Sequence, residues 1–301
     1  MGDATRKLTG LITGADIEKR ITFIHAAKDP SGRLRCGAAV GVGPDCIERG
    51  QALIAAGADA LFIDAATGHT TRIQEVISKL RELGDVPVIA GNVVTAEGAR
   101  FLVEAGASGV KVGVGPGSIC TTRVISGVGM PQFTAIQNVA SYCRDRGIAV
   151  IADGGIRYSG DIVKALAAGA DLVMLGSILA GTRESPGATV HYQGRRFKSY
   201  RGMGSVGAMR KGSGDRYGQN SSGKLVAEGV EGRVPYKGAL SDVVFQLMGG
   251  LKSGMGYVGA SDLADLRERA EFTRITSGGL KESHVHDITI TEEPVNYQPS
   301  A

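Results

Sequence analysis

The chain has 301 residues, 43% of them apolar, and a formal net charge of +4 without a long basic run. This length and composition allow one large α/β domain with a full core, and the modest charge argues against nucleic acid as a partner. No apolar stretch approaches a membrane helix, and residues 1–15 lack the apolar core of a signal peptide. The four cysteines have neither metal-knuckle spacing nor a disulfide pattern. We therefore expect a cytoplasmic protein that contacts no membrane.

Short apolar runs alternate with helical patterns along the middle of the chain. The predicted strands are residues 34–41, 58–64, 86–91, 109–114, 148–152 and 171–175. The clearest helix between them covers residues 71–83, where apolar side chains recur at helical spacing, and Ser159 is the predicted N-cap of another helix. Regular alternation of apolar strands with helices predicts a parallel sheet that is covered on both faces.

Polar or glycine-rich segments follow most of the predicted strands. They are Asp64, Asn92, residues 113–120, residues 153–155 and residues 176–177. The carboxyl ends of the strands form one functional face in a (β/α)8 barrel, whereas an open doubly wound sheet gathers ligands at a switch point. The pattern therefore favours the barrel.

The number of strands bears on the completeness of that barrel. A closed barrel needs eight strands, and its loops after strands seven and eight often bind phosphate. The glycine-rich residues 153–155 and 176–177 suit those loops but follow the fifth and sixth predicted strands. We therefore predict a TIM barrel that is incomplete at the N-terminus and lacks two βα units.

A glycine-crowded loop at residues 113–129 carries Cys120 directly after a predicted strand. Glycines let the backbone turn sharply and approach a ligand, and nearby backbone N–H groups stabilise the thiolate, which is the nucleophilic form. A lone cysteine is more often a structural thiol, so this loop alone leaves both roles open. Cys36, Cys46 and Cys143 fall in predicted strands or helices, where we expect inert structural thiols.

The pattern changes after Ser185. Residues 194–238 are basic and rich in glycine, serine and tyrosine, with little periodicity. A connection that long without regular structure is usually functional or disordered. Arg216 and Tyr217 lie within it, although an arginine in such a loop is commonly a solvated surface charge. Helices are predicted to resume near residues 240–252 and 262–271.

Several motifs in order resemble those of bacterial inosine-5′-monophosphate (IMP) dehydrogenases. They are Gly-Pro-Gly-Ser-Ile-Cys-Thr-Thr (115–122), Ala-Asp-Gly-Gly-Ile (152–156), Tyr-Arg-Gly-Met-Gly-Ser (200–205), Arg-Tyr (216–217) and Glu-Gly-Val-Glu-Gly-Arg-Val-Pro-Tyr-Lys-Gly (228–238). The resemblance runs from about Gly32 to the C-terminus. It implies a (β/α)8 barrel into which the family usually inserts two CBS regulatory modules after the second βα unit.

The same resemblance implies a division of the chain. Residues 1–20 resemble the end of the CBS insert. Residues 21–301 resemble the catalytic barrel domain, with a mobile flap at about 194–238. The first two βα units of the family have no counterpart, which agrees with the strand count.

By this resemblance, the chain oxidises IMP to XMP with NAD, the committed step of guanine nucleotide synthesis. Cys120 attacks C2 of the purine and forms a thioimidate. Arg216 activates the water that releases XMP, with support from Tyr217. Thr122 and Glu228 form a second proton path.

The resemblance also assigns binding residues. Those for IMP are Ser118, Asp153, Gly154, Gly155, Gly176, Ser177, Tyr200, Arg201, Gly202, Met203, Gly204 and Glu228, with Asp153 at the ribose hydroxyls and the glycines and Ser177 at the phosphate. Those for NAD are Asp64, Asn92, Gly113, Val114 and Gly115. A potassium ion is assigned to Gly115, Gly117 and Cys120, together with Glu282, Ser283 and His284 of a neighbouring subunit. The family resemblance further implies a homotetramer.

Two other functions stay open. GMP reductase shares the barrel and the cysteine loop but runs its hydride chemistry with NADPH and lacks the long flap with its Arg-Tyr pair. A truncated, inactive subunit of the same family would only associate with other chains. Arg216 and Tyr217 favour the dehydrogenase.

Overall fold

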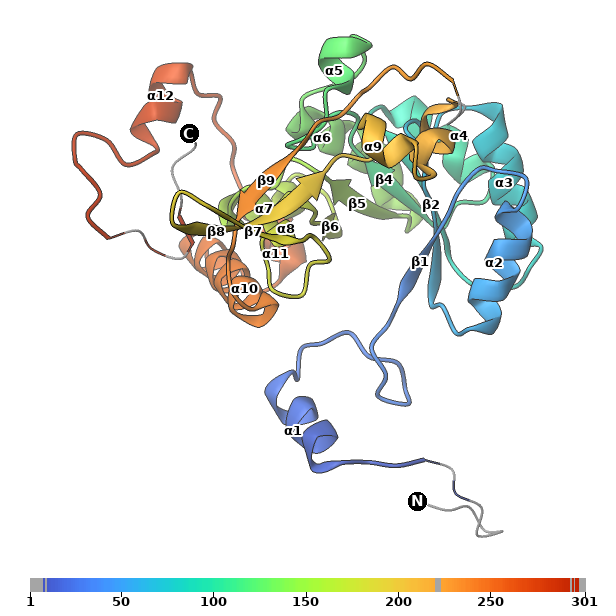
Figure 1. The fold of residues 1–301 in the computed structure, drawn as a ribbon, viewed down its shortest axis with the longest axis horizontal. Helices are drawn as coiled ribbons and strands as arrows, with labels where there is room; N and C mark the ends of the chain where they lie inside the picture. Colours follow the sequence, from blue (N-terminus) through green and yellow to red (C-terminus); the bar gives the residue numbers. More distant parts are fainter. Residues whose placement is uncertain (1–7, 9, 220–222, 293, 295, 298–301) are drawn as a thin grey trace.

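A sheet of six parallel strands forms the centre of the molecule (Figure 1). The computed structural model describes residues 8, 10–219, 223–292, 294 and 296–297. The strands are β1 (Gly37–Val40), β2 (Ala60–Ile63), β3 (Val88–Val93), β4 (Gly109–Val112), β5 (Ala149–Asp153) and β6 (Leu172–Met174), and they pair in chain order. All six predicted strands are confirmed. Parallel strands whose order in the sheet follows the chain without reversal have the arrangement of a (β/α)8 barrel.

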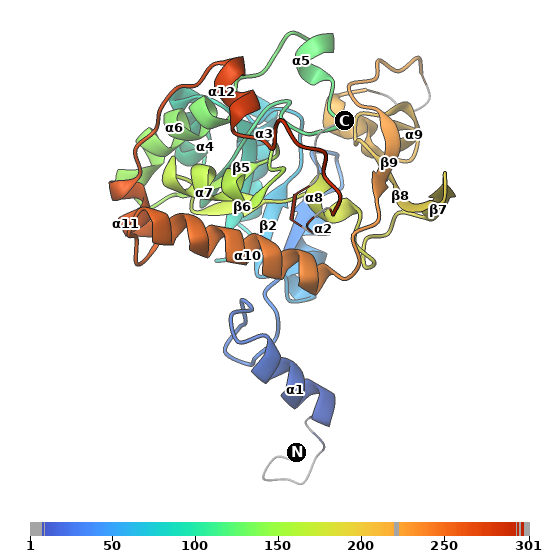
Figure 2. The same ribbon diagram turned by 90° about the vertical axis from the view of Figure 1, so that its left-hand side faces the viewer.

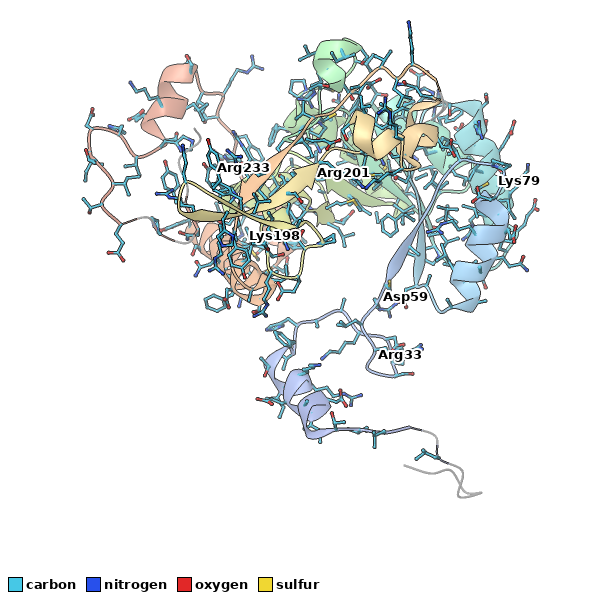
Figure 3. All side chains as sticks on the ribbon, viewed as in Figure 1. Arg33, Asp59, Lys79, Lys198, Arg201 and Arg233 are labelled. Atoms are coloured by element: carbon cyan, nitrogen blue, oxygen red, sulfur yellow. The ribbon has the colours of Figure 1, made fainter. Side chains whose placement is uncertain are left out.

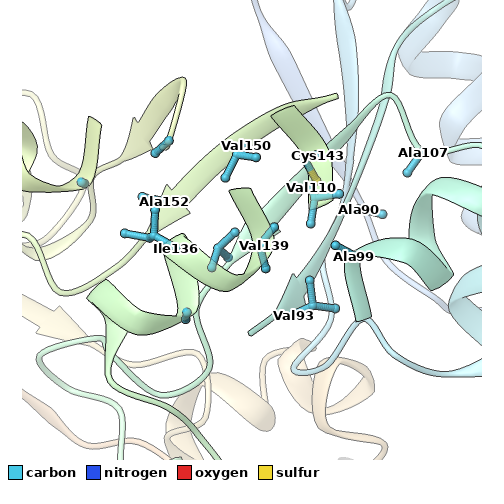
Figure 4. Packing of buried hydrophobic residues seen from close by; sticks show 14 of the residues in the cluster. Ala90, Val93, Ala99, Ala107, Val110, Ile136, Val139, Cys143, Val150 and Ala152 are labelled. Atoms are coloured by element: carbon cyan, nitrogen blue, oxygen red, sulfur yellow. The ribbon is translucent and has the colours of Figure 1, made fainter. Parts of the chain in front are cut away.

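Helices cover the outer face of this sheet. They are α2 (Cys46–Ala55), α3 (Thr71–Arg81), α4 (Ala96–Glu104), α6 (Gln132–Cys143) and α7 (Ser159–Ala167), each after a strand and in contact with the next helix along. Figure 4 shows Val110 and Val150 of the strands facing Val139 of α6, and all three are at most 1% exposed. Burial of such a side chain stabilises the fold by about 1.5–3 kcal/mol.

The helix starts show how short-range signals position the elements. The predicted helix at residues 71–83 is confirmed over Thr71–Arg81, with the Thr70 hydroxyl accepting from the Ile73 N–H at 3.4 Å. The predicted N-cap Ser159 is instead the first residue of α7, and Tyr158 is the N-cap. The carboxylate of Asp161 accepts the N–H of Arg157 and of Tyr158 at 2.9 and 3.0 Å. This carboxylate, on the third residue of the helix, reaches back and satisfies backbone donors just before the helix begins, as in a capping box.

A second, antiparallel sheet corrects the expectation of irregular chain at residues 194–238. Its strands are β7 (Thr189–Tyr192), β8 (Arg195–Arg201) and β9 (Glu231–Pro235). The Arg233 guanidinium lies 3.6 Å from the centre of the Tyr192 ring and 5.4 Å from that of Phe197. Figure 3 shows Arg233 on this sheet. Arginine stacked on aromatic rings here takes the place of aliphatic contacts between strands.

The segment between β8 and β9 contains α9 (Val206–Met209) and the short 3-10 helix η2 (Ser213–Tyr217). Residues 220–222 of the predicted flap lie outside the described residues. Other short helices are α5 (Thr122–Ile125), η1 (Arg144–Arg146) and α8 (Ser177–Ala180).

The two ends of the chain lie at the periphery. Figures 1 and 2 show α1 (Gly14–Thr22) standing apart from the sheet, and it has no buried residue. Of the predicted CBS remnant, residues 1–7 and 9 lie outside the described residues. The predicted C-terminal helices are confirmed as α10 (Leu240–Tyr257), which packs against α7, and α11 (Leu263–Arg269), followed by α12 (Ser277–Glu282). None of the helices in the described ranges is long and apolar enough to span a membrane.

Candidate active site

A cavity of about 360 Å³ lies at the carboxyl ends of the parallel strands. The predicted residues that line it are Asn92, Gly113, Val114, Gly115, Gly117, Ser118, Cys120, Thr122, Asp153, Gly154, Gly155, Gly176, Ser177, Tyr200, Arg201, Gly202, Met203, Gly204, Arg216, Tyr217 and Glu228. Segments that are more than 100 residues apart in the sequence therefore meet at one cavity. Four predicted residues do not line it: Asp64, Glu282, Ser283 and His284.

Cys120 stands half-buried at the end of the loop that leaves β4. Its backbone N–H donates to the Gly117 carbonyl at 3.1 Å, which closes the loop into a turn. The thiol lies 3.2 Å from the Thr122 hydroxyl, to which it donates. A thiol beside a hydroxyl that can rotate to donate in turn is suited to stabilise a thiolate.

Backbone hydrogen bonds join the cysteine loop to the segment around Glu228. The Thr121 N–H donates to the Glu228 carbonyl at 2.9 Å, and the Val230 N–H donates to the Ile119 carbonyl at 3.0 Å. The Glu228 N–H in turn donates to the Gly204 carbonyl at 2.9 Å. The two loops and the approach to β9 therefore hold one another in register around the thiol.

Gly204 marks a close approach within this assembly. A Cβ atom at this position would come within 2.9 Å of the Tyr217 ring and its hydroxyl oxygen. The absence of a side chain at Gly204 thus lets Tyr217 reach the cavity wall that carries Cys120.

Arg216 connects this region to the loop after β2. Its guanidinium forms an ion pair with Asp64, and its carbonyl accepts the Ala66 N–H at 3.0 Å. The Arg216 Nε atom is buried without a hydrogen-bond partner in the described part of the chain. Burial raises the pKa of the adjacent Tyr217, and the positive charge of Arg216 opposes that rise. Tyr217 is thus a neutral hydroxyl group beside a cation.

Asp153 ends β5 and is held from two sides. Its Oδ2 atom accepts from the Lys111 ammonium at 2.8 Å and from the Asn92 amide at 3.0 Å. Asn92 lies inside β3 rather than after it, because β3 extends to Val93. The Gln132 amide donates to the Asp153 carbonyl at 3.2 Å. Lys111 and Gln132 were not predicted from the sequence; a lysine inside an apolar strand was the available signal for the first.

Another part of the cavity wall is formed by backbone. Gly154 and Gly155 adopt φ angles of 90° and 81°, in the left-handed region that glycine tolerates. A Cβ atom at Gly154 would come within 2.8 Å of the Pro116 side chain. With Gly176 and Ser177, these glycines expose backbone N–H groups that can hold an anion.

The residues predicted to hold potassium are divided between two places. Gly115, Gly117 and Cys120 line the cavity, whereas Glu282, Ser283 and His284 lie at the end of α12. The His284 Nδ1 atom lies 3.0 Å from the Tyr297 hydroxyl. No cluster of three or more histidine, cysteine or acidic side chains suits a metal among the described residues.

The other three cysteines differ from one another. Cys46 and Cys143 are buried, as expected of structural thiols, and desolvation raises the pKa of Cys143 to about 11. Cys36 is exposed and lies just before β1, so its placement inside a strand is wrong, whereas its inertness stays a prediction. Its backbone N–H donates to the Asp59 carboxylate at 2.7 Å, its carbonyl accepts the Asp59 N–H at 2.8 Å, and its thiol donates to the Gly37 carbonyl at 3.8 Å.

A parallel sheet with its cavity at the carboxyl ends of the strands places the chain among barrel-type α/β proteins. Within that class, residues 14–286 match the family described as the IMP dehydrogenase / GMP reductase domain, and the chain belongs to this family. It is 60% identical to an inosine-5′-monophosphate dehydrogenase of Aquifex aeolicus and 58% identical to one of Bacillus subtilis, each over 98% of this chain. The chain spans 61% of the length of these relatives.

A solved structure gives the same family. The chain is similar to a GMP reductase of Trypanosoma brucei, a C318A variant in complex with guanosine 5′-monophosphate. The TM-score is 0.87 at 44% sequence identity, and the match covers 96% of this chain and 60% of that one.

Proposed function

We propose that the chain carries the catalytic site of an IMP dehydrogenase, which oxidises IMP to XMP. The observation that carries this proposal is the meeting of Cys120, Thr122, Arg216, Tyr217 and Glu228 around one cavity. The relatives that share about 60% of the sequence are named for this activity.

The first half-reaction uses the thiol. The Cys120 sulfur adds to C2 of the purine, and an S–C2 bond forms. The C2–H bond breaks and its electron pair leaves with the hydrogen, so that a thioimidate remains on the enzyme. When bound, NAD supplies the acceptor for that hydride. Thr122, 3.2 Å from the sulfur, stabilises the thiolate before the attack.

The second half-reaction uses the segment around Arg216. The oxygen of a water adds to C2, the C2–S bond breaks, and Cys120 returns as a thiolate while the water loses its protons. Arg216 and Tyr217 orient that water and take up its proton, and Thr122 and Glu228 provide a second path. An arginine acting as a base needs strong local tuning, because it is normally always protonated. Its Nε atom, buried without a hydrogen-bond partner in the described part of the chain, supports a special environment, whereas the ion pair with Asp64 favours the charged guanidinium and must open before Arg216 acts as a base.

The nucleotide would lie along the length of the cavity. Asp153 accepts the ribose hydroxyls, and the N–H groups of Gly154, Gly155 and Gly176 with the Ser177 hydroxyl hold the phosphate. On the cofactor side of the cavity, the backbone of Gly113 packs so closely against the Asp153 carbonyl that a side chain there would clash with it. Asp64 is paired with Arg216 in this structure, so it can hold the NAD ribose only after that pair opens.

The remaining parts of the proposal concern assembly and the ion. Loop carbonyls of Gly115, Gly117 and Cys120 fit a potassium ion in kind, although the Gly117 carbonyl already accepts one hydrogen bond. Three carbonyls do not fill the shell of a potassium ion. Glu282, Ser283 and His284 of a neighbouring subunit would complete it, so the potassium site and the homotetramer are proposed together.

A test separates this function from the two alternatives. The purified chain with IMP and NAD should produce NADH, measured by absorbance at 340 nm, and XMP, measured by chromatography. Consumption of NADPH with GMP and no NADH from IMP would instead identify a reductase, which the similar solved structure makes a real rival. Nucleotide binding without either reaction would indicate an inactive subunit.

A further inference from the structure

Lys111 is a buried lysine in the middle of a barrel strand. It stands in β4 between Val110 and Val112, and only 5% of the residue is exposed. Successive side chains of a strand point to opposite faces, so Lys111 points away from the helices that cover the two valines. Its ammonium contacts confirm this direction: it lies 2.8 Å from Asp153 of β5 and 3.9 Å from the Met174 sulfur of β6.

A lysine at this position is unfavourable unless it has a particular task. Barrel interiors are filled mainly by branched apolar side chains, and a buried ammonium requires a charged partner. Well-packed apolar residues commonly replace a buried ion pair without loss of stability. Gly91 of the neighbouring strand leaves the room that Lys111 takes, since a Cβ atom there would come within 2.7 Å of the Lys111 Cβ. The fold therefore accommodates this cation at a cost that stability alone does not explain.

The partner of Lys111 is the residue that faces the cavity. Asp153 lines the cavity, whereas Lys111 does not. Both donors, from Lys111 and Asn92, go to the Oδ2 atom of Asp153. Within the described ranges no hydrogen bond reaches the Oδ1 atom, so one oxygen is anchored and the other is left for a ligand.

We propose that Lys111 is a positioning residue that fixes the Asp153 carboxylate for the ribose hydroxyls and so sets the preference for ribo- over 2′-deoxyribonucleotides. This inference rests on the proposed function, because it takes the nucleotide to be IMP. The free Oδ1 atom of a fixed carboxylate has two lone pairs and can accept both hydroxyls of a ribose at once. A site built to bind a hydroxyl discriminates against the analogue that lacks it, because a polar group is then left unpaired. A carboxylate free to rotate would discriminate less.

The test compares Lys111→Met with Lys79→Met as a matched control. Methionine keeps the length of the side chain and removes the charge, and Lys79 is exposed on α3, far along the chain from the cavity. We expect Lys111→Met to raise the Kd for IMP by about 10- to 100-fold. The preference for IMP over 2′-deoxy-IMP, measured by calorimetry, should fall by about 10-fold. Lys79→Met should change neither.

A double variant separates positioning from general structural damage. If Lys111 acts through Asp153, adding Lys111→Met to Asp153→Asn should change the Kd for IMP by less than about twofold. A single Lys111→Met variant that folds and keeps the full preference for IMP overturns the proposal. If that variant does not fold, Lys111→Gln replaces it, with the same expected loss of preference and the same overturning result.

Failure of the proposed function can be distinguished from failure of the positioning role of Lys111. If the unaltered chain binds neither IMP nor 2′-deoxy-IMP, the proposed function fails. Crystal structures then decide the positioning role. A rotated Asp153 side chain in Lys111→Met supports it, and an unchanged Asp153 rotamer overturns it.

Discussion

The Arg216 guanidinium pairs with the carboxylate of Asp64 and thereby joins η2, beside the cavity that Cys120 lines, to the loop after β2. The Arg216 carbonyl reinforces the link by accepting the Ala66 N–H at 3.0 Å. An ion pair is reversible, whereas the backbone hydrogen bonds between the cysteine loop and Glu228 form a continuous set. Arg216, a detachable group because its side chain is held by an ion pair, therefore lines the same cavity as a thiol on a fixed loop. This arrangement suits a reaction in two halves, in which water must be excluded first and activated later.

Replacement of Cys120 tests the first half-reaction. We expect Cys120→Ala to lower NADH production from IMP by more than about 1000-fold, because Cys120 is the one thiol among the described residues that line the cavity. IMP binding measured by calorimetry should persist. The exposed Cys36 offers a matched control, since Cys36→Ala removes an accessible thiol outside the cavity. Equal turnover of Cys120→Ala and the unaltered chain would contradict the assignment.

Replacement of Arg216 tests the second half-reaction. Arg216→Ala should give a rapid burst of about one NADH per active site, followed by steady turnover slowed by about 100-fold or more, because the thioimidate accumulates. Rapid-quench and stopped-flow absorbance measure the two phases. Arg210, exposed in the same segment and absent from the cavity wall, provides the control variant Arg210→Ala. Loss of the burst with unchanged steady turnover would show that the two roles are assigned wrongly.

The thiols should differ in their reaction with alkylating agents. Desolvation raises the pKa of Cys143 from 9.0 to about 11, so Cys143 stays protonated at pH 8 and its buried thiol should not react with iodoacetamide. Exposed Cys36 should react under the same conditions, as read by mass spectrometry of tryptic peptides. Modification of native Cys143 as fast as that of Cys36 would contradict its burial.

The raised pKa of Cys143 also predicts how the stability of the protein changes with pH. Because the folded pKa of Cys143 lies above the ordinary value of 9.0, its contribution is fully present below pH 9 and is lost as the pH rises through about 11. Urea unfolding between pH 8 and 11 should therefore show a decline that is smaller in Cys143→Ala. An equal decline in both proteins would place its cause elsewhere.

The six parallel strands could be predicted from the sequence because each is a short apolar run next to a turn signal, as in β4. The antiparallel sheet could not be predicted, since β8 carries three arginines and a lysine among only two aromatic residues. Its packing depends on Arg233, which lies about 35 residues further along. The cysteine loop was identified by its glycines. The role of Lys111 was hidden because a single lysine in an apolar run does not reveal that its partner, Asp153, stands on the next strand.

The edges of the parallel sheet lead to the last prediction. β3 and β4 are buried along their whole length, whereas β1 and β6 are partly exposed and each has a strand partner on one side only among the described residues. Leu172 of β6 is 53% exposed. Unpaired edges invite association, and incomplete layers inside a barrel leave side chains without neighbours. We therefore expect backbone amides of β1 and β6 to exchange hydrogen much faster than those of β3 and β4.

A segment of two βα units, taken from the part of the relatives that this chain does not match, should slow that exchange and raise Tm when added or fused. For a domain of this size, each kcal/mol of added unfolding free energy raises Tm by about 2–4 °C. Hydrogen exchange by mass spectrometry and calorimetry measure both effects. Uniform protection across all six strands, together with turnover of IMP at about 1–1000 per second by this chain alone, would show that the sheet is complete without further strands.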